Sequence, residues 1–148
     1  MPSKRNALQQ AVYLLSRRDY SRQELMRRLN LGRYEPEDIE AAVERVSARG
    51  YLNDNAFARN LYEQLNRTGR YGIRAIRFKL AQKGLAEALI SEITGDYDFE
   101  EEYERALRLV AAKFVSPPTG EQKQKIARFL SARGFADSTI SRVFAQFE

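Results

Sequence analysis

One pattern recurs three times in the 148 residues and constrains the fold more than any other feature. In each copy, two large aliphatic residues four positions apart are followed by a glycine, and the first copy (Leu25, Leu29, Gly32) has a slightly different loop. Such self-similarity at a fixed period is typical of tandem structural repeats. The other two copies align without a gap at an offset of about 50 residues: Ile76 with Ile126, Leu80 with Leu130, Gly84 with Gly134, Ile90 with Ile140, and Ile93 with Val143.

The spacing of apolar residues predicts helices throughout. They recur every three or four positions, and the alternation typical of strands is nearly missing. A unit of three short helices buries little apolar surface alone, so stacking on a neighbour is needed to hide the rest. The sequence therefore predicts an all-α fold, an elongated, curved array of three tandem three-helix repeats that resemble helix-turn-helix units. The predicted boundaries are 1–53, 54–98 and 99–148.

Local signals mark the helix ends. Ser21-Arg22-Gln23-Glu24 is a capping box, in which the serine and the glutamate each satisfy a backbone N–H, and Tyr20 can pack on Leu25. Asp54 is expected to cap the helix that carries Phe57. Further predicted starts are Pro36 and Thr119–Gln122, the latter after a break at Pro117-Pro118, and the predicted stops are Gly32, Gly50, Gly84 and Gly134.

The composition argues against catalysis. Cysteine and histidine are both absent, which removes disulfides, thiolate metal sites and the commonest general base. No glycine pattern forms a phosphate-binding loop, so no cofactor is expected. The longest markedly apolar stretch, Ala11–Leu15, is too short to span a bilayer, and we expect a cytoplasmic protein with no membrane partner.

One acidic run has the spacing that opens a calcium loop. Glu101 stands where such a loop requires glycine, and Leu107 stands where it requires the closing glutamate. The favoured interpretation is a solvated helix start, stabilised by the helix dipole. The run comprises Asp96, Asp98, Glu100, Glu101, Glu102 and Glu104.

Basic residues are concentrated in particular segments. The chain has 25 Lys and Arg against 20 Asp and Glu, and the stretch from Asn66 to Gly84 contains no acid. Basic residues gathered in this way favour contact with a polyanion. The candidate contacts with a nucleic-acid filament are Arg17, Arg18, Arg22, Arg27, Arg28, Arg67, Arg70, Arg74, Arg77, Lys79, Lys83, Lys123, Lys125 and Arg128.

The second repeat carries the most suggestive basic face. Arg74 and Arg77 are expected on an arc separate from the apolar one, together with Phe78. Glycines beside Arg70-Tyr71 would let the backbone approach a phosphate or a partner closely. Tyr71, Phe78 and Tyr34 are candidate stacking platforms for bases, although each is individually more typical of a packed residue.

Several of these strings, taken together and in order, resemble the RecX family along essentially the whole chain. They are Leu14-Leu15-Ser16-Arg17-Arg18, Ser21-x-x-Glu24-Leu25, Gly50-Tyr51-Leu52-Asn53-Asp54 with Phe57-Ala58, Gly72-Ile73-x-x-Ile76 with Lys83-Gly84-Leu85, and Arg128-Phe129-Leu130-x-x-Arg133-Gly134-Phe135.

The resemblance implies a regulator of the RecA recombinase. Members of the family bind along the RecA–DNA filament and limit its ATP hydrolysis, strand exchange and extension during DNA repair and the SOS response. The implied partners are the RecA filament and, weakly and with salt sensitivity, single- and double-stranded DNA, bound by a monomer. The matching residues are expected to be structural: Ser21, Glu24, Leu25, Leu29, Gly50, Asp54, Phe57, Ile76, Leu80, Gly84, Leu130, Gly134 and Phe135.

Two other classes of protein remain open. A free-standing helix-turn-helix DNA-binding protein would need amide and arginine side chains together on one recognition face, and Arg74 and Arg77 lack amide companions. A protein–protein adaptor would have no affinity for bare DNA. An enzyme is not expected, because no set of residues offers a nucleophile with its base.

Overall fold

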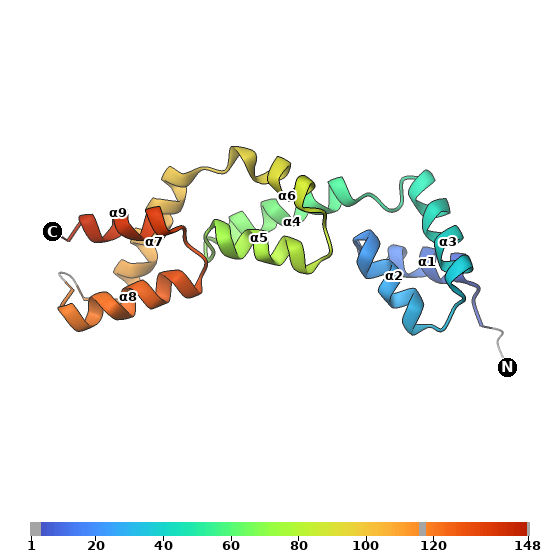
Figure 1. Ribbon diagram of the computed structural model, residues 1–148, viewed down its shortest axis with the longest axis horizontal. Coiled ribbons are helices and arrows are strands. Elements are labelled where there is room, and N and C mark those ends of the chain that lie inside the picture. The colour runs from blue at the N-terminus through green and yellow to red at the C-terminus, as the bar shows by residue number, and fades with distance from the viewer. Residues whose placement is uncertain (1–3, 116–117, 148) are drawn as a thin grey trace. The chain divides into compact units, whose positions relative to one another are not determined.

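The computed structural model describes residues 4–115 and 118–147, and within these residues every regular element is a helix. The elements form three consecutive groups of three helices, which confirms the all-α tandem-repeat prediction (Figure 1). The first group is α1 (Ala7–Arg17), α2 (Arg22–Leu31) and α3 (Pro36–Ala48). The second is α4 (Asp54–Thr68), α5 (Ile73–Gln82) and α6 (Glu87–Ile93), followed by the 3-10 turn η1 (Thr94–Asp96). The third is α7 (Phe99–Lys113), α8 (Gly120–Ala132) and α9 (Asp137–Ala145).

The predicted capping box at Ser21 and the predicted helix start at Thr119 are both confirmed. The Ser21 hydroxyl accepts from the Glu24 backbone N–H at 3.2 Å, and the Glu24 carboxylate accepts from the Ser21 N–H at 3.2 Å. Thr119 and Gln122 make the same reciprocal pair at the start of α8, at 3.3 and 3.2 Å. Of the break that precedes α8, residue 117 lies outside the described residues. Pro36 is the first residue of α3, where its missing N–H leaves no bond unmade.

The prediction that Asp54 caps α4 is wrong by one residue. The Asn53 side chain accepts from the Ala56 N–H at 3.1 Å, and Asp54 is already the first helical residue. The Asp54 carboxylate instead accepts from the backbone N–H of Arg22, at 2.7 Å. Either side chain can cap a helix, so the sequence could not decide between two adjacent candidates.

The helix stops differ between the repeats in an informative way. Gly50, Gly84 and Gly134 adopt positive φ angles of 78°, 79° and 81°, as expected for glycines that end helices. Gly32 has φ −76°, and the left-handed conformation falls on Arg33, with φ 63°. Arg33 therefore occupies the position of Gly84 and Gly134 in the repeat, at a cost of about 1–2 kcal/mol for a side chain in that conformation.

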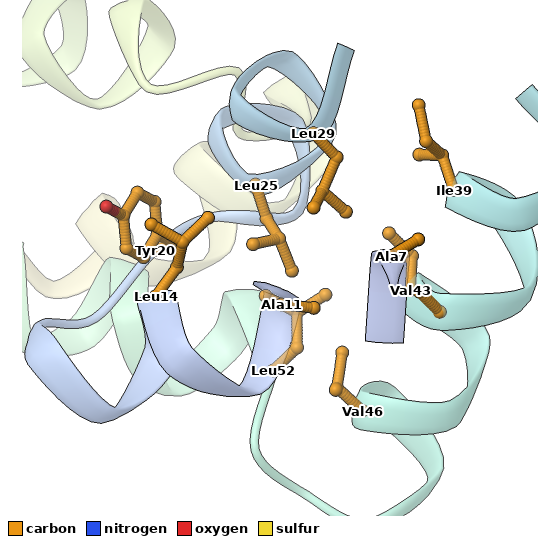
Figure 2. Packing of buried hydrophobic residues seen from close by; sticks show 11 residues of the cluster. Ala7, Ala11, Leu14, Tyr20, Leu25, Leu29, Ile39, Val43, Val46 and Leu52 are labelled. Atoms are coloured by element: carbon orange, nitrogen blue, oxygen red, sulfur yellow. The ribbon is translucent and has the colours of Figure 1, made fainter. Parts of the chain in front are cut away.

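The core of the first repeat joins all three of its helices. Leu25 and Leu29 of α2 are fully buried and pack with Ala11 of α1 and Val43 of α3 (Figure 2). Tyr20 belongs to the same cluster, in keeping with its predicted packing on Leu25.

The core of the third repeat contains the same repeat positions. Ile126, Leu130, Phe135 and Val143 are all fully buried, together with Ala106 of α7. In the second repeat Ile76 and Leu80 are equally buried, whereas Phe57 is buried only in part.

The chain divides into two compact units, and the division falls inside the second repeat. The first unit comprises residues 1–61 and 80–90, so it holds the first repeat together with the start of α4 and the end of α5. The second comprises residues 62–79 and 91–148, and it holds the start of α5 with the third repeat. Each unit thus contains one contact between consecutive repeats.

Candidate functional site

The second helix of every repeat is the basic one. α2, α5 and α8 each carry three Lys or Arg residues and at most one acid. The sequence showed stretches of charge, but their recurrence on the same helix of each repeat became visible only once the helices were placed. The basic residues are Arg22, Arg27 and Arg28 in α2, Arg74, Arg77 and Lys79 in α5, and Lys123, Lys125 and Arg128 in α8.

Part of the predicted contact set projects freely into solvent. Within residues 4–115 and 118–147, six of the candidate side chains are exposed and make no hydrogen bond, ion pair or ring contact. Unpaired cations on a surface can bind phosphates without first breaking a bond inside the protein. These unpaired cations are Arg27, Arg28, Arg70, Lys123, Lys125 and Arg128.

Other predicted contacts are engaged inside the chain. Lys79 lies 4.6 Å from the centroid of the Tyr71 ring, Arg77 donates to the Thr94 hydroxyl at 3.4 Å, and Arg67 pairs with Glu63 at 3.8 Å. In the first repeat the engaged side chains are Arg17 on the Tyr13 ring, Arg18 on the Tyr20 ring and Glu24, and Arg22 with Glu44.

Arg74 is the most heavily engaged of the predicted contacts. Its guanidinium lies 3.2 Å from the Asp137 carboxylate and donates to the Ser131 carbonyl at 3.0 Å. A second hydrogen bond reaches the Ser131 hydroxyl at 3.2 Å. Arg74 therefore ties the start of α5 to α8 and α9, in addition to any external contact it makes.

The contact between the first and second repeats, called here the first joint, consists of Ser21–Glu24 with Asp54 and Lys83-Gly84. The Ser21 hydroxyl, fully buried, donates to the Lys83 carbonyl, and the Arg22 N–H donates to Asp54. The Lys83 ammonium lies 3.3 Å from the Glu24 carboxylate. Each of these three interactions in the first joint involves at least one side chain.

The contact between the second and third repeats, called here the second joint, consists of Gly72–Ala75 with Arg133–Phe135, together with Glu102. The Gly72 N–H donates to the Arg133 carbonyl at 3.0 Å, and the Arg74 N–H to the Gly134 carbonyl at 2.8 Å. A Cβ on Gly72 would lie 2.6 Å from the Gly134 carbonyl oxygen, so only glycine fits. The close approach that Gly72 permits is therefore to the chain's own backbone.

The two joints use equivalent positions of the repeat. Each repeat has two buried aliphatic residues four positions apart in its second helix. Ser21 and Gly72 each stand four residues before the first of these, Leu25 or Ile76. Lys83 and Arg133 each stand three residues after the second of these, Leu80 or Leu130. In both joints Ser21 or Gly72 donates to the carbonyl of Lys83 or Arg133. In the first repeat the carbonyl at that position, of Gly32, accepts from the Lys4 ammonium.

The interpretation of the acidic run as a solvated helix start is wrong for Glu102. This carboxylate is fully buried and accepts four hydrogen bonds. Its donors are the Ile73 N–H at 2.7 Å, the Tyr97 hydroxyl at 2.8 Å, the Ala136 N–H at 3.3 Å, and the Thr139 hydroxyl. Glu102 thereby holds the starts of α5 and α9 against α7.

Two side chains close to the Glu102 carboxylate, Tyr97 and Arg105, are also buried. Burial, and then the hydrogen bond to Glu102, raise the pKa of Tyr97 far above its ordinary value. Arg105 donates to the Tyr71 carbonyl at 2.8 Å and lies 3.4 Å from Glu101.

The rest of the run behaves as a helix start. The Asp98 side chain caps α7 by accepting from the Glu100 and Glu101 N–H groups, at 3.0 and 3.1 Å. Glu100 pairs with Arg142 at 2.6 Å, and this hydrogen bond lowers the pKa of the Glu100 carboxyl. Among the described residues, no group of three or more acidic side chains is arranged to hold a metal ion.

The three aromatic residues predicted to stack on bases differ in how far their rings are available to a ligand. The Phe78 side chain is 62% exposed on α5 and can meet a base. Tyr71 already carries Lys79 over its ring. Tyr34 packs against the first core, donates its hydroxyl to the Arg5 carbonyl at 2.6 Å and lies under Lys4.

A polar groove beside α2 contains residues that the sequence did not single out. It is a hollow of about 490 Å³ whose lining residues are Arg22, Gln23, Met26, Arg27, Asn30, Asp54 and Gly84. Gln23, Arg27 and Asn30 are spaced four and three residues apart, so two amides flank an unpaired arginine on one face of the helix. The spacing of Gln23, Arg27 and Asn30 is visible in the sequence, and the helix register that puts the three on one face is a property of α2.

No described helix has both the length and the apolar character needed to cross a bilayer.

Comparison with known proteins covers nearly the whole chain. Family models of the first, second and third three-helix domains of RecX match residues 7–45, 53–92 and 100–144. The regulatory protein RecX of Stenotrophomonas maltophilia is 35% identical over 143 residues, which span 95% of this chain and 86% of that protein. The regulatory protein RecX of Vibrio campbellii is 36% identical over 133 residues, which span 88% of this chain and 84% of that protein.

A solved structure has the same fold. The crystal structure of RecX from Lactobacillus salivarius superposes with a TM-score of 0.83 at 18% identity, and the match covers 95% of this chain and 94% of that one. The three family models and the identity to the two regulatory proteins establish the relationship. The chain belongs to the RecX family of regulatory proteins.

Proposed function

We propose that this protein is an inhibitor of the RecA recombinase that binds the RecA–DNA filament and limits its ATP hydrolysis, strand exchange and extension in DNA repair and the SOS response. Family membership supports the regulatory role. The observation that carries the mode of binding is the set of unpaired cations on the second helices of the first and third repeats, with Arg70 before that of the second. The protein acts by binding alone, without catalysis or a cofactor.

The mechanism follows from repetition. Successive repeats offer a basic helix each, and a long partner with regularly spaced phosphates can engage several at once. A protein that makes these contacts in only one filament geometry shifts the assembly equilibrium toward that geometry. Inhibition at substoichiometric amounts would indicate action at growing filament ends, and inhibition near saturation would indicate coating.

We propose a cytoplasmic monomer with repeats at 1–53, 54–98 and 99–148. Bare single- and double-stranded DNA would bind weakly. If about three to five phosphates are neutralised, raising salt from about 50 to 200 mM weakens this binding roughly 40- to 500-fold.

The test is the ATP hydrolysis of RecA on single-stranded DNA, measured with increasing amounts of this protein alongside its binding to the same DNA without RecA. We expect inhibition at protein concentrations at which bare DNA is largely unbound. Unchanged hydrolysis at saturating protein, or inhibition that only follows the occupancy of bare DNA, would contradict the proposal.

A second candidate function is favoured by the groove beside α2. Glutamine and asparagine bind adenine edges and arginine binds guanine edges, so Gln23, Arg27 and Asn30 could read bases in a duplex. This function predicts that some duplex sequences resist competition by random DNA. Equal competition by all duplexes would exclude it.

A further inference from the structure

Tyr51 is an exposed aromatic residue that directly follows Gly50, the glycine after α3. α3, α4, α5 and α8 are each followed by a glycine with positive φ, and an apolar residue after such a glycine frequently packs back on its helix. After α5 and α8 that residue is Leu85, 6% exposed, or Phe135, fully buried. After α3 it is Tyr51, which is 60% exposed.

The backbone holds Tyr51 in this outward position. Its N–H donates to the Val46 carbonyl at 2.9 Å, and the Gly50 N–H donates to Ser47 at 3.0 Å. The following residue, Leu52, enters the core in its place, with 6% exposure. Tyr51 is thus fixed without being needed for packing.

An apolar hollow opens beside this ring, entirely within the first repeat. It has a volume of about 280 Å³ and is lined by Val12, Leu15 and Ser16 of α1 with Arg49 and Tyr51. Val12 is 41% exposed, which leaves an unusual amount of aliphatic surface on a helix whose opposite face is packed. Pockets for whole small molecules are generally larger, so this one suits a single large side chain.

The one charged residue that lines the hollow is basic. Arg49 lines it, is exposed, and has no partner among the described residues. α1 contains no acidic residue, and Arg5 and Arg17 lie on the neighbouring Tyr13 ring at 3.9 and 5.9 Å. A partner that places an apolar side chain here meets Arg49 at the lining of the hollow, with Arg5 and Arg17 at the Tyr13 ring of the same helix.

The hollow lined by Val12, Leu15, Ser16, Arg49 and Tyr51 is called here the Tyr51 groove. We propose that the Tyr51 groove binds a short acidic segment of another protein. This segment inserts one large apolar side chain between Val12, Leu15 and Tyr51 and pairs its carboxylates with Arg49 and Arg17. The aliphatic walls favour such an anchor over a nucleobase, and Arg5 already covers a face of the Tyr13 ring. The second helices offer a phosphate backbone several unpaired cations, whereas the lining of this groove offers one, Arg49, so the groove is the less favourable site for nucleic acid. The proposal does not depend on the proposed action on RecA.

The test uses fluorescein-labelled synthetic peptides of Asp and Glu with one central Leu, Ile, Phe, Trp or Met, and fluorescence anisotropy as the readout. Each peptide has two matched controls, one with alanine in place of the anchor and one with lysines in place of the acids. Fluorescein-labelled oligothymidine serves as the nucleic-acid probe. We expect at least one anchored acidic peptide to bind more tightly than both of its controls.

Substitutions then locate the site. Tyr51→Ala should weaken peptide binding about tenfold, as for an interface anchor. Arg49→Ala should weaken it about two- to fivefold, with a smaller salt dependence. Leu31→Ala is the matched control, because Leu31 is 73% exposed and lies outside the groove, and it should change nothing. Circular dichroism and the thermal midpoint verify that each variant is folded.

Three outcomes would overturn the proposal. The first is that no anchored peptide exceeds its alanine control. The second is that folded Tyr51→Ala binds the peptide as wild type does. The third is that Tyr51→Ala loses oligothymidine binding while peptide binding is kept, which would make the groove a nucleic-acid site.

Discussion

The two joints between repeats occupy equivalent positions but are built from different chemistry. In the first joint a serine hydroxyl reaches the Lys83 carbonyl, and a partly exposed Glu24–Lys83 pair lies beside it. In the second joint a backbone N–H reaches the Arg133 carbonyl, and the buried Glu102 fastens the surrounding helices.

The difference shows how a repeat can keep its geometry while its sequence changes. A side chain at Ser21 spans the distance that Gly72 closes by bringing backbones together. The closer approach excludes a Cβ and buries polar groups, so each buried donor in the second joint needs a partner. We therefore expect the second joint to be sensitive to single changes and the first to tolerate most of them.

Glu102→Ala should have the largest effect. It leaves the Ile73 and Ala136 N–H groups and two hydroxyls without an acceptor, and we expect a loss of about 3–5 kcal/mol in unfolding free energy. Urea unfolding measures it, with Glu104→Ala, an exposed neighbour, as the control. If Glu102→Ala does not fold, Glu102→Gln should still lose more than Glu104→Gln. Equal stabilities would show that the buried carboxylate does not hold the second joint.

Gly134→Ala and Gly84→Ala compare the joints directly. Both glycines have positive φ, but a Cβ on Gly134 would overlap the Ala75 backbone, whereas one on Gly84 would meet the Gln23 side chain, whose end can swing away but whose Cβ, at 2.5 Å, must shift. Gly50→Ala, with a positive φ and open space around it, measures the conformational cost alone, about 1 kcal/mol. In urea unfolding we expect Gly84→Ala to lose somewhat more stability than Gly50→Ala, and Gly134→Ala to lose clearly more than either. The reverse order would refute the contrast between the joints.

Ser21→Ala should have an intermediate effect. It removes the cap of α2 and the hydrogen bond to Lys83, for a loss of about 1–2 kcal/mol. Thr119→Ala removes the same kind of cap from α8 without a bond to another repeat, so the difference between the two variants isolates the contribution of the joint. A smaller loss for Ser21→Ala than for Thr119→Ala in thermal unfolding would mean that the bond across the joint adds nothing.

Glu24→Gln should have the smallest effect. Glutamine can still complete the capping box, so the variant removes only the charge that faces Lys83 and Arg18. Lys83 is 41% exposed, and we expect a loss of about 0–1 kcal/mol that disappears at high salt. A large loss that is independent of salt would instead place a strong, shielded ion pair in the first joint.

The sequence predicted what local chemistry decides. The capping box at Ser21, the helix start at Thr119 and the glycine stops at Gly50, Gly84 and Gly134 follow from residue types at fixed spacings. The left-handed conformation of Arg33 was not predicted, because it is imposed by the register of the repeat and not by the type of residue.

The burial of Glu102 was not predicted, because its hydrogen-bond partners are distant in sequence. Ile73 lies 29 residues before it and Ala136 lies 34 residues after it. A signal was nevertheless present, since Glu102 stands four and eight residues before the buried Ala106 and Val110, on the apolar face of α7.

The basic residues now fall into two classes that the sequence could not separate. Arg74 and Lys83 hold joints, whereas Arg27, Arg28 and Arg128 project without a partner among the described residues. Formal charge is the same in both classes, and only the position of an acid on another repeat distinguishes them.

The most direct test of this division measures RecA inhibition and thermal stability together in two variants. For Arg27→Glu with Arg28→Glu, we predict an unchanged unfolding midpoint and inhibition of ATP hydrolysis weakened about tenfold or more. For Arg74→Met, we predict a lowered midpoint with near-normal inhibition at temperatures where the variant is folded. Normal inhibition by the folded double variant, combined with lost inhibition by folded Arg74→Met, would contradict the account.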